Sequence, residues 1–112
     1  MNNPKVSIIT ICYNSGRTIR DTIQSVIDQN YSNIEYLLID GASTDDTLQI
    51  VNSFNSERIR LISEKDKGLY DALNKGLRNA TGDIIGILHS DDFYAHHHVI
   101  SDIVHLFDTK KD

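Results

Sequence analysis

Two adjacent carboxylates, those of Asp91 and Asp92, come shortly after the apolar stretch Ile84-Ile85-Gly86-Ile87-Leu88. A short apolar run without alternation is typical of a strand buried on both faces. Such a strand would carry both acids to the edge of a sheet, where open α/β folds bind their ligands. Carboxylates about 4 Å apart repel each other by roughly 4 kcal/mol at an effective dielectric constant near 20. A divalent cation with oxygen ligands would relieve that repulsion, whereas a helix N-terminus that favours acids explains the pair equally well.

Polar residues also follow two other predicted strands. Tyr13 comes after the first strand and offers an aromatic face and a hydroxyl group to a flat base or a sugar. Asp40 comes after the second strand and can accept hydrogen bonds from ring N–H or ribose hydroxyl groups. The alternative for Asp40 is a carboxylate that holds a turn together through backbone amides. We favour the ligand role, because two separate strand ends would carry acids to the same edge.

The charged loop Lys65-Asp66-Lys67-Gly68 is a candidate phosphate contact. Lys65 and Lys67 could meet phosphate charge, but solvated loop lysines are equally consistent with the sequence. The chain has neither G-x-G-x-x-G after the first strand nor G-x-x-x-x-G-K-[ST], so the usual phosphate-binding loops are absent. A phosphate-bearing ligand would therefore need a metal ion as its main counter-charge, which connects Asp91 and Asp92 with a nucleotide.

Three consecutive histidines, His96-His97-His98, resemble a metal site at first inspection. On a helix, consecutive side chains point about 100° apart, so we expect the three rings not to converge on one ion. A solvent-facing start of a helix is the favoured interpretation. Asp45 and Asp46 are interpreted in the same way, as acids that serve a helix N-terminus.

The predicted elements alternate strand and helix four times. The strands are expected at 6–12, 34–39, 58–63 and 83–88, and the helices at about 17–29, 43–55, 69–79 and 96–108. Ser15 is predicted to cap the first helix, and Ser43 and Asp46 have capping-box spacing at the second. Alternation with short connections predicts a parallel sheet with helices on both faces. The third strand alternates in its first half, which favours a position near the sheet edge.

Composition limits the function classes. The 112 residues form one domain or part of one, and the net charge of −5 argues against binding to nucleic acid. Cys12 is the only cysteine, which excludes an internal disulfide. No apolar run approaches the ~20 residues of a membrane span, and the N-terminus lacks signal-peptide features. A cytoplasmic location, or one at the inner face of the cell membrane, is therefore expected.

Four stretches together resemble the nucleotide-binding half of family 2 glycosyltransferases with the GT-A fold, including bacterial enzymes that build polysaccharides. They are residues 6–14, 39–45, 68–76 and 80–92, in the order and spacing of that family. Within the third stretch, Tyr-Asp-Ala-Leu-Asn-Lys-Gly is similar to a subgroup that makes capsule and other surface polysaccharides. The resemblance covers almost the whole chain. It implies a Rossmann-like, three-layer α/β/α fold with a mainly parallel sheet, truncated after the metal-motif strand and the following helix.

The resemblance also implies an activity, the inverting transfer of a hexosyl group. The donor would be a nucleoside diphosphate sugar, UDP- or GDP-linked, and the acceptor a saccharide or a lipid-linked saccharide. Asp91 and Asp92 match the DXD-type motif, so Asp92, with Asp91, would bind Mn²⁺ or Mg²⁺, and Asp91 would also lie near the ribose or sugar. Tyr13 and Asp40 would hold the base, and the segment from Lys67 onward would line the diphosphate.

Two departures from the family pattern affect this interpretation. Gly41 stands where many relatives have a second aspartate that reads uracil. The general base of the family lies well downstream of the metal motif, so we expect it beyond residue 112 and expect this chain alone to bind a donor without efficient transfer.

Two other function classes stay open. A nucleotidyltransferase would need a glycine-rich basic loop after the first strand, and Tyr13-Asn14-Ser15-Gly16-Arg17 fits that poorly. A complete 112-residue chain would instead be a non-catalytic nucleotide-sugar-binding or assembly module. A fourth strand left unpaired by truncation could lead to a homodimer.

Overall fold

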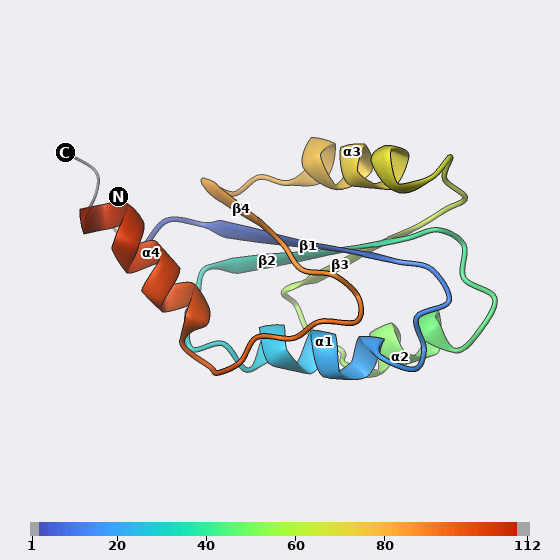
Figure 1. Cartoon of the computed structure of the whole chain (residues 1–112), viewed down its shortest axis with the longest axis horizontal. Coiled ribbons are helices and arrows are strands. Elements are labelled where there is room, and N and C mark those ends of the chain that lie inside the picture. Colours follow the sequence, from blue (N-terminus) through green and yellow to red (C-terminus); the bar gives the residue numbers. More distant parts are fainter. Residues whose placement is uncertain (1–2, 110–112) are drawn as a thin grey trace.

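The computed structural model describes residues 3–109, in which four strands alternate with four helices. The strands are β1 (Val6–Cys12), β2 (Ile34–Asp40), β3 (Ile59–Ser63) and β4 (Ile84–Ile87). The helices are α1 (Ile19–Ile27), α2 (Thr47–Ser53), α3 (Leu69–Asn79) and α4 (Val99–Thr109) (Figure 1). The predicted order of strands and helices is confirmed. Within the described residues, no helix has the length and apolar character needed to cross a membrane.

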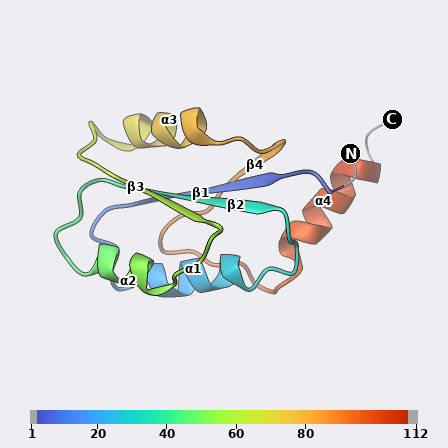
Figure 2. The same cartoon turned by 180° about the vertical axis from the view of Figure 1, so that it is seen from behind.

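All four strands belong to one sheet, with the order β3-β2-β1-β4 and parallel pairing throughout. Val6 at the start of β1 pairs with Ile34 of β2 and Ile84 of β4, and Cys12 at its end pairs with Asp40. β1 and β2 are therefore central, and β3 lies at an edge, as its alternating sequence predicts (Figure 2). Because all strands are parallel, their carboxyl ends share one edge of the sheet.

Helices cover both faces of the sheet, with α3 on one side and α1 and α2 on the other (Figure 1). The larger core joins the sheet to α1, α2 and α4, and the smaller one lies under α3. The smaller core consists of Ile9, Leu37, Ile39 and Ala72. A Cβ atom on Gly76 would lie 2.8 Å from Cγ2 of Ile9, so α3 rests directly on the sheet.

The leucines of α3 do not all face the sheet. Leu69 is 62% exposed and Leu77 is 42% exposed, and the buried residues of the helix are Ala72, Lys75 and Gly76. The close approach at Gly76 explains this pattern, because the helix surface nearest the sheet has little room for large side chains.

The fourth strand was expected to be buried on both faces, and this is wrong. Ile84 is buried, whereas Ile85 is 45% and Ile87 is 52% exposed. β4 is an edge strand, and α3 packs on β1 and β2 rather than on β4. One face of β4 is consequently open to solvent, and pairing of this edge with a second copy stays a prediction.

Two predicted helix caps are also absent. α1 begins at Ile19, after Thr18 at the N-cap position, and α2 begins at Thr47; neither helix has a side-chain cap. The hydroxyl of Ser15 lies near that of Ser90, 3.2 Å away, and the hydroxyl of Ser43 donates to Asp40. Both serines therefore hold loops together instead of starting helices.

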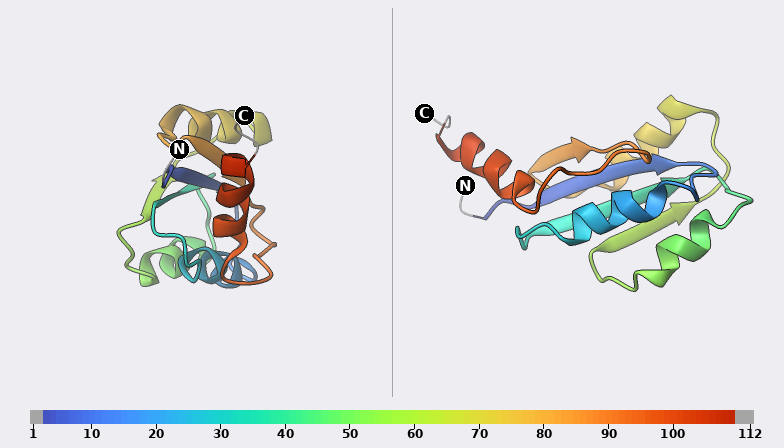
Figure 3. Two further views of the ribbon diagram at one scale, coloured as in Figure 1. Left: turned by 90° about the vertical axis from the view of Figure 1, so that its left-hand side faces the viewer. Right: turned by 60° about the horizontal axis from the view of Figure 1, so that its bottom comes forward.

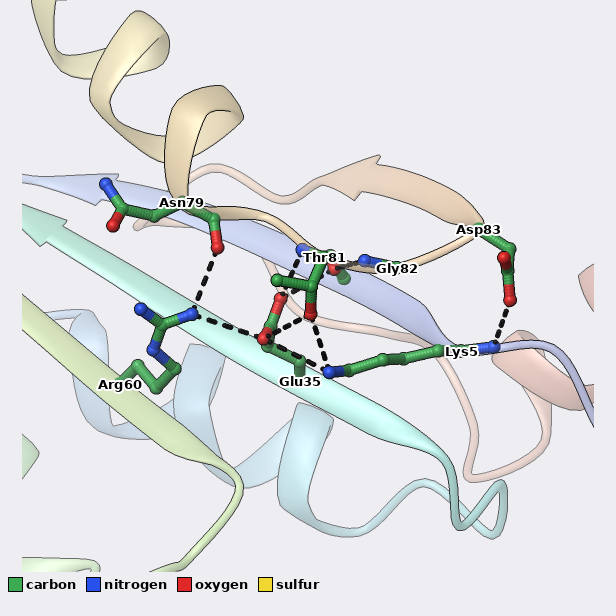
Figure 4. Close-up of polar contacts among 8 residues, drawn as sticks. Lys5, Glu35, Arg60, Asn79, Thr81, Gly82 and Asp83 are labelled. Carbon is green, nitrogen blue, oxygen red and sulfur yellow. Dashed lines mark hydrogen bonds and ion pairs between the residues drawn. The ribbon is translucent and has the colours of Figure 1, made fainter.

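A buried carboxylate, Glu35, organises the opposite end of the sheet, where the strands begin (Figure 4). Its oxygens accept hydrogen bonds from the hydroxyl of Ser7 (2.8 Å) and from the N–H (3.0 Å) and hydroxyl (2.9 Å) of Thr81. Lys5 and Arg60 lie 3.4 and 3.3 Å from the same carboxylate. The cluster joins β1, β2, β3 and the segment that precedes β4.

Gly82, beside this cluster, is predicted to be intolerant of a side chain. A Cβ atom there would lie 2.6 Å from Oγ of Ser7 and 2.8 Å from the backbone of both Lys5 and Ser7. Because a strand backbone cannot move aside, Gly82→Ala is expected to lower the free energy of unfolding by about 1–3 kcal/mol, measured by urea denaturation. Gly86→Ala is the matched control, since its Cβ would meet only the flexible end of Ile8, at 3.3 Å. Equal losses for the two variants would contradict the prediction.

Candidate functional site

The carboxyl ends of the four strands bring together the loops 13–18, 41–46, 64–68 and 88–95 at one edge of the sheet (Figure 3). These loops contain four of the residues that the sequence predicts for ligand binding: Tyr13, Lys67, Asp91 and Asp92. The fifth, Asp40, is the last residue of β2 and directly precedes the second loop. The parallel topology alone places them on the same side of the molecule.

Hydroxyl groups of α1 fix the backbone that carries Asp91 and Asp92. The carbonyl of Ser90 accepts hydrogen bonds from the hydroxyls of Thr18 (2.8 Å) and Thr22 (3.0 Å). The hydroxyl of Thr22, which is buried, also lies within hydrogen-bond distance of the carbonyl of Asp92. Both aspartate side chains are exposed. The helix therefore positions the backbone and leaves the carboxylates directed to solvent.

The two aspartates suit a hard divalent cation. Within residues 3–109, neither carboxylate has a protein hydrogen-bond or ion-pair partner, so both retain their full capacity as ligands. Carboxylate oxygens are the ligands that Mg²⁺ and Mn²⁺ prefer. Two exposed carboxylates supply only part of the coordination shell of a divalent cation. Phosphate oxygens and water would have to supply the remaining ligands. The pair fits an ion shared with a diphosphate better than an ion enclosed by protein.

Tyr13 is presented by a loop that is locked to its neighbour. The Asn14 backbone has φ 48°, and its side-chain oxygen accepts the N–H groups of Thr44 (2.8 Å) and Asp45 (3.2 Å). The N–H of Asn14 donates to the hydroxyl of Ser43 (2.8 Å). Tyr13 itself is 61% exposed. The first two loops thus form one unit, and the tyrosine ring is free to lie against a planar ligand.

Asp40 is placed differently from the other predicted site residues, because it is fully buried. Its carboxylate accepts the N–H of Ser43 (2.9 Å) and the hydroxyl of Ser63 (2.9 Å), and Sγ of Cys12 lies 3.6 Å away. Burial and the adjacent carboxylate raise the pKa of the Cys12 thiol. The observed contacts are those of a turn-holding carboxylate, the alternative interpretation; direct contact between Asp40 and a base stays a prediction.

The third loop is held in place by Lys75 of α3, which is buried. Its ammonium group contacts the carbonyl of Lys65 (3.2 Å) and the carboxylates of Glu64 (3.2 Å) and Asp71 (3.6 Å). The N–H of Lys67 donates to Asp71 (2.9 Å), and this bond is the main reason why the pKa of Asp71 is lowered. The side chain of Lys67 is exposed at the same edge as the two aspartates.

An apolar groove of about 560 Å³ runs beside Asp91, between α3 and the end of β4. Its lining comprises Ile11, Leu69, Leu73, Ile87, Leu88, His89, Ser90 and Asp91. The exposed apolar side chains noted above thus lie in part along this groove, next to one of the two candidate metal ligands.

The three histidines were expected to diverge on a helix, and this is wrong for two of them. α4 begins only at Val99, so the histidines lie in the preceding turn. The rings of His96 and His98 stack with centroids 3.9 Å apart, and Nδ1 of His98 lies 3.0 Å from Oδ2 of Asp102. The ligand atoms of these three residues lie within 4.8 Å of one another. All three residues are exposed, as expected.

Several site residues were missed from the sequence alone. Thr18 and Thr22 are one helical turn apart, and this i, i+4 spacing was a usable signal. Asn14 occurs where a strand ends, a common position for left-handed backbone. Lys75 follows Asp71 by four residues and could have been recognised as its partner.

Comparison with known sequences places the chain among related proteins. Residues 7–112 match the sequence profile described as Glycosyl transferase family 2. EpsE of Bacillus subtilis is 44% identical over 95 residues, which are 81% of this chain and 34% of EpsE. The Escherichia coli UDP-Glc:alpha-D-GlcNAc-diphosphoundecaprenol beta-1,3-glucosyltransferase WfaP is 40% identical over 107 residues, 95% of this chain and 42% of WfaP. The chain therefore spans about a third to two-fifths of the length of these relatives.

Solved structures share the same fold. S. aureus TarS 1–349 in complex with UDP-GlcNAc superimposes with a TM-score of 0.89 at 26% identity, over 96% of this chain and 32% of TarS. The mannosyltransferase PcManGT from Pyrobaculum calidifontis, in complex with GDP-Man and Mn²⁺, gives a TM-score of 0.85 at 28% identity, over 93% of this chain and 32% of that enzyme. The predicted α/β fold with its parallel sheet is confirmed.

Proposed function

Because the chain belongs to glycosyltransferase family 2, we propose that it is the donor-binding part of an inverting hexosyltransferase in bacterial polysaccharide synthesis. One observation supports this most strongly. Two exposed carboxylates that have no partner in the described part of the chain, Asp91 and Asp92, share a sheet edge with an exposed aromatic ring, Tyr13, and an exposed lysine, Lys67. The two carboxylates suit a metal ion bound to the phosphates of a nucleoside diphosphate sugar. The tyrosine ring suits its base, and the lysine suits the remaining phosphate charge.

Asp92 and Asp91 would hold Mn²⁺ or Mg²⁺. The metal, when bound with the donor, would stabilise the negative charge that builds on the departing nucleoside diphosphate. The contribution of the chain is to fix the two carboxylates, which it does through the hydroxyls of Thr18 and Thr22 on the carbonyls of residues 90 and 92. A rigid backbone matters because metal ligands must be held close to their productive geometry.

The base would lie against the ring of Tyr13, on the loops joined by Asn14. In this proposal Asp40 acts indirectly, since its carboxylate holds Ser43, which in turn receives the N–H of Asn14. Lys67 would approach the diphosphate, and its backbone is already fixed by Asp71.

The relatives support the choice of donor and metal. WfaP is named for a UDP-glucose donor and a diphosphoundecaprenol-linked acceptor, and PcManGT is described with GDP-Man and Mn²⁺. By analogy, we infer a UDP- or GDP-sugar donor, a manganese or magnesium ion, and a saccharide acceptor that is free or lipid-linked.

Calorimetric titration with UDP, GDP and CDP, each with Mn²⁺ and with EDTA, tests the proposal. We expect UDP or GDP to bind with a Kd of roughly micromolar order in the presence of Mn²⁺, and this binding to vanish with EDTA. The same affinity with and without the metal would contradict the role of the acidic pair. Absence of binding to all three nucleotides would contradict the donor site itself.

A further inference from the structure

Three loops of the candidate site meet at Gly41, which has no side chain. A Cβ atom at this position would lie 2.8 Å from Oδ2 of Asp66 and 3.5 Å from Cδ1 of Tyr13. The carboxylate of Asp66 therefore occupies the space above the end of β2 and lies beside the tyrosine ring. Any side chain at residue 41 would displace it.

Asp66 is held in this position by its own loop. Its Oδ1 atom accepts the N–H of Gly68 (3.1 Å), whose φ of 111° turns the chain into α3. The loop is tied down at its start by the N–H of Glu64, which donates to the carbonyl of Asp40 (3.0 Å), and by Lys75 on the carbonyl of Lys65. The carboxylate is thus pre-oriented before any ligand arrives.

The second oxygen of Asp66, Oδ2, is available to a ligand. Within residues 3–109 it has no hydrogen-bond or ion-pair partner, whereas Asp40, the other acid nearby, is fully buried and bonded to Ser43 and Ser63. Among the described residues, both oxygens of Asp40 have partners, whereas the Asp66 carboxylate keeps one oxygen without a partner.

We propose that Oδ2 of Asp66 reads the nucleobase of the donor by accepting the ring N–H of a base stacked on Tyr13. This inference rests on the proposed function and specifies its substrate as a uridine diphosphate sugar. Uracil presents one ring donor, N3–H, and needs one acceptor. Cytosine presents a lone pair at N3, which a carboxylate repels, and guanine presents two adjacent donors that would require both carboxylate oxygens. Because uracil needs one acceptor and Oδ2 is the oxygen of Asp66 that has no partner among the described residues, we expect uracil to be preferred over guanine.

A modified ligand tests the proposal without altering the protein. N3-methyl-UDP lacks the N–H group but keeps the uracil ring, the ribose and the diphosphate. In Mn²⁺-containing buffer, we expect it to bind the chain about 10- to 100-fold more weakly than UDP, the range for losing a hydrogen bond to a charged group. Equal affinities for the two compounds would overturn the proposal.

The variant Asp66→Asn tests it from the side of the protein. Asparagine keeps an oxygen for the N–H of Gly68 and places an NH₂ donor where Oδ2 lies, so the loop is retained while the acceptor becomes a donor. UDP affinity is expected to fall about 10- to 100-fold and CDP affinity to rise, because an NH₂ group can donate to N3 of cytosine. Glu57→Gln, which removes an exposed carboxylate just before β3, is the charge-matched control and should leave both affinities unchanged.

The outcomes separate this inference from the function on which it rests. If the unmodified chain binds UDP only with Mn²⁺, but N3-methylation and Asp66→Asn have no effect, the donor site stands and the role of Asp66 is overturned. The same holds if the chain prefers CDP or GDP to UDP. If it binds no nucleoside diphosphate, both the proposed function and the role of Asp66 fail.

Discussion

Replacing Asp92 with alanine is expected to abolish Mn²⁺-dependent binding of the nucleoside diphosphate and to leave the fold intact. The Asp92 carboxylate is exposed and makes no contact with the described protein, and the residue is held only through its backbone. Its N–H donates to the carbonyl of His89 (3.0 Å), and its carbonyl is approached by Thr22. Alanine keeps both backbone groups. Since even groups that only support metal ligands affect affinity by about 10- to 100-fold, loss of a ligand should cost at least 100-fold.

Two measurements are needed to interpret this result. Calorimetric titration with UDP and Mn²⁺ gives the affinity, and thermal denaturation establishes that the variant is folded. Asp21→Ala, which removes an exposed carboxylate on α1, controls for the change in net charge and should bind like the unaltered chain. Metal-dependent affinity that persists in Asp92→Ala would rule out the assignment of the acidic pair.

The strands and their order along the chain could be predicted, because the residues within each strand carry its sequence pattern. The β-branched run Val6–Cys12 is a strand in the structure as in the sequence pattern, and the alternation with helices implies parallel pairing. The burial of each residue in the sheet depends also on contacts with elements that are distant in the sequence. Exposure of Ile85 and Ile87 depends on which strands α3 covers, and the sequence around β4 contains no information about that.

The candidate site also combines features that could be predicted from the sequence with features that could not. Asp91 and Asp92 could be recognised because they come two residues after the apolar run that ends at Leu88, and the shared edge follows from the topology. The burial of Asp40 depends on hydroxyls from two other segments, those of Ser43 and Ser63. The position of the Asp66 carboxylate depends on the absence of a side chain at Gly41. Contacts of this kind arise between loops and leave no periodicity for sequence analysis to detect.

The predicted caps of α1 and α2 were wrong for a related reason. Ser15 and Ser43 have the residue type and spacing of caps, but each hydroxyl finds a partner in or near the candidate site instead. A serine near a strand end can either cap a helix or hold a loop, and the tertiary structure decides which of these it does. The loops at this edge therefore gain order at the expense of helix capping.

Glu35→Gln is expected to lower the free energy of unfolding by about 3 kcal/mol at pH 7. Burial alone would raise the pKa of Glu35, but hydrogen bonds from Thr81 and Ser7 and the charge of Lys5 outweigh it and lower the pKa from 4.5 to about 2. A shift of this size corresponds to roughly 3 kcal/mol of stabilisation of the ionised form. Glutamine would replace one acceptor by a donor that faces Lys5 and Arg60, both donors themselves.

The pH dependence distinguishes this charge effect from a simple packing defect. Because the pKa of Glu35 is lower in the folded chain than in the unfolded chain, its stabilisation is complete above pH 4.5 and disappears as the pH falls toward 2. Urea denaturation from pH 7 to pH 3 should therefore show the difference between the unaltered chain and Glu35→Gln becoming smaller below pH 4.5. Glu64→Gln is the control, because Glu64 is exposed and Lys75 keeps the carboxylate of Asp71 as a partner, so loss of the Glu64 charge should cost less than about 1 kcal/mol at any pH. A difference that stays constant with pH would mean that Glu35 acts through its shape, and not through its charge.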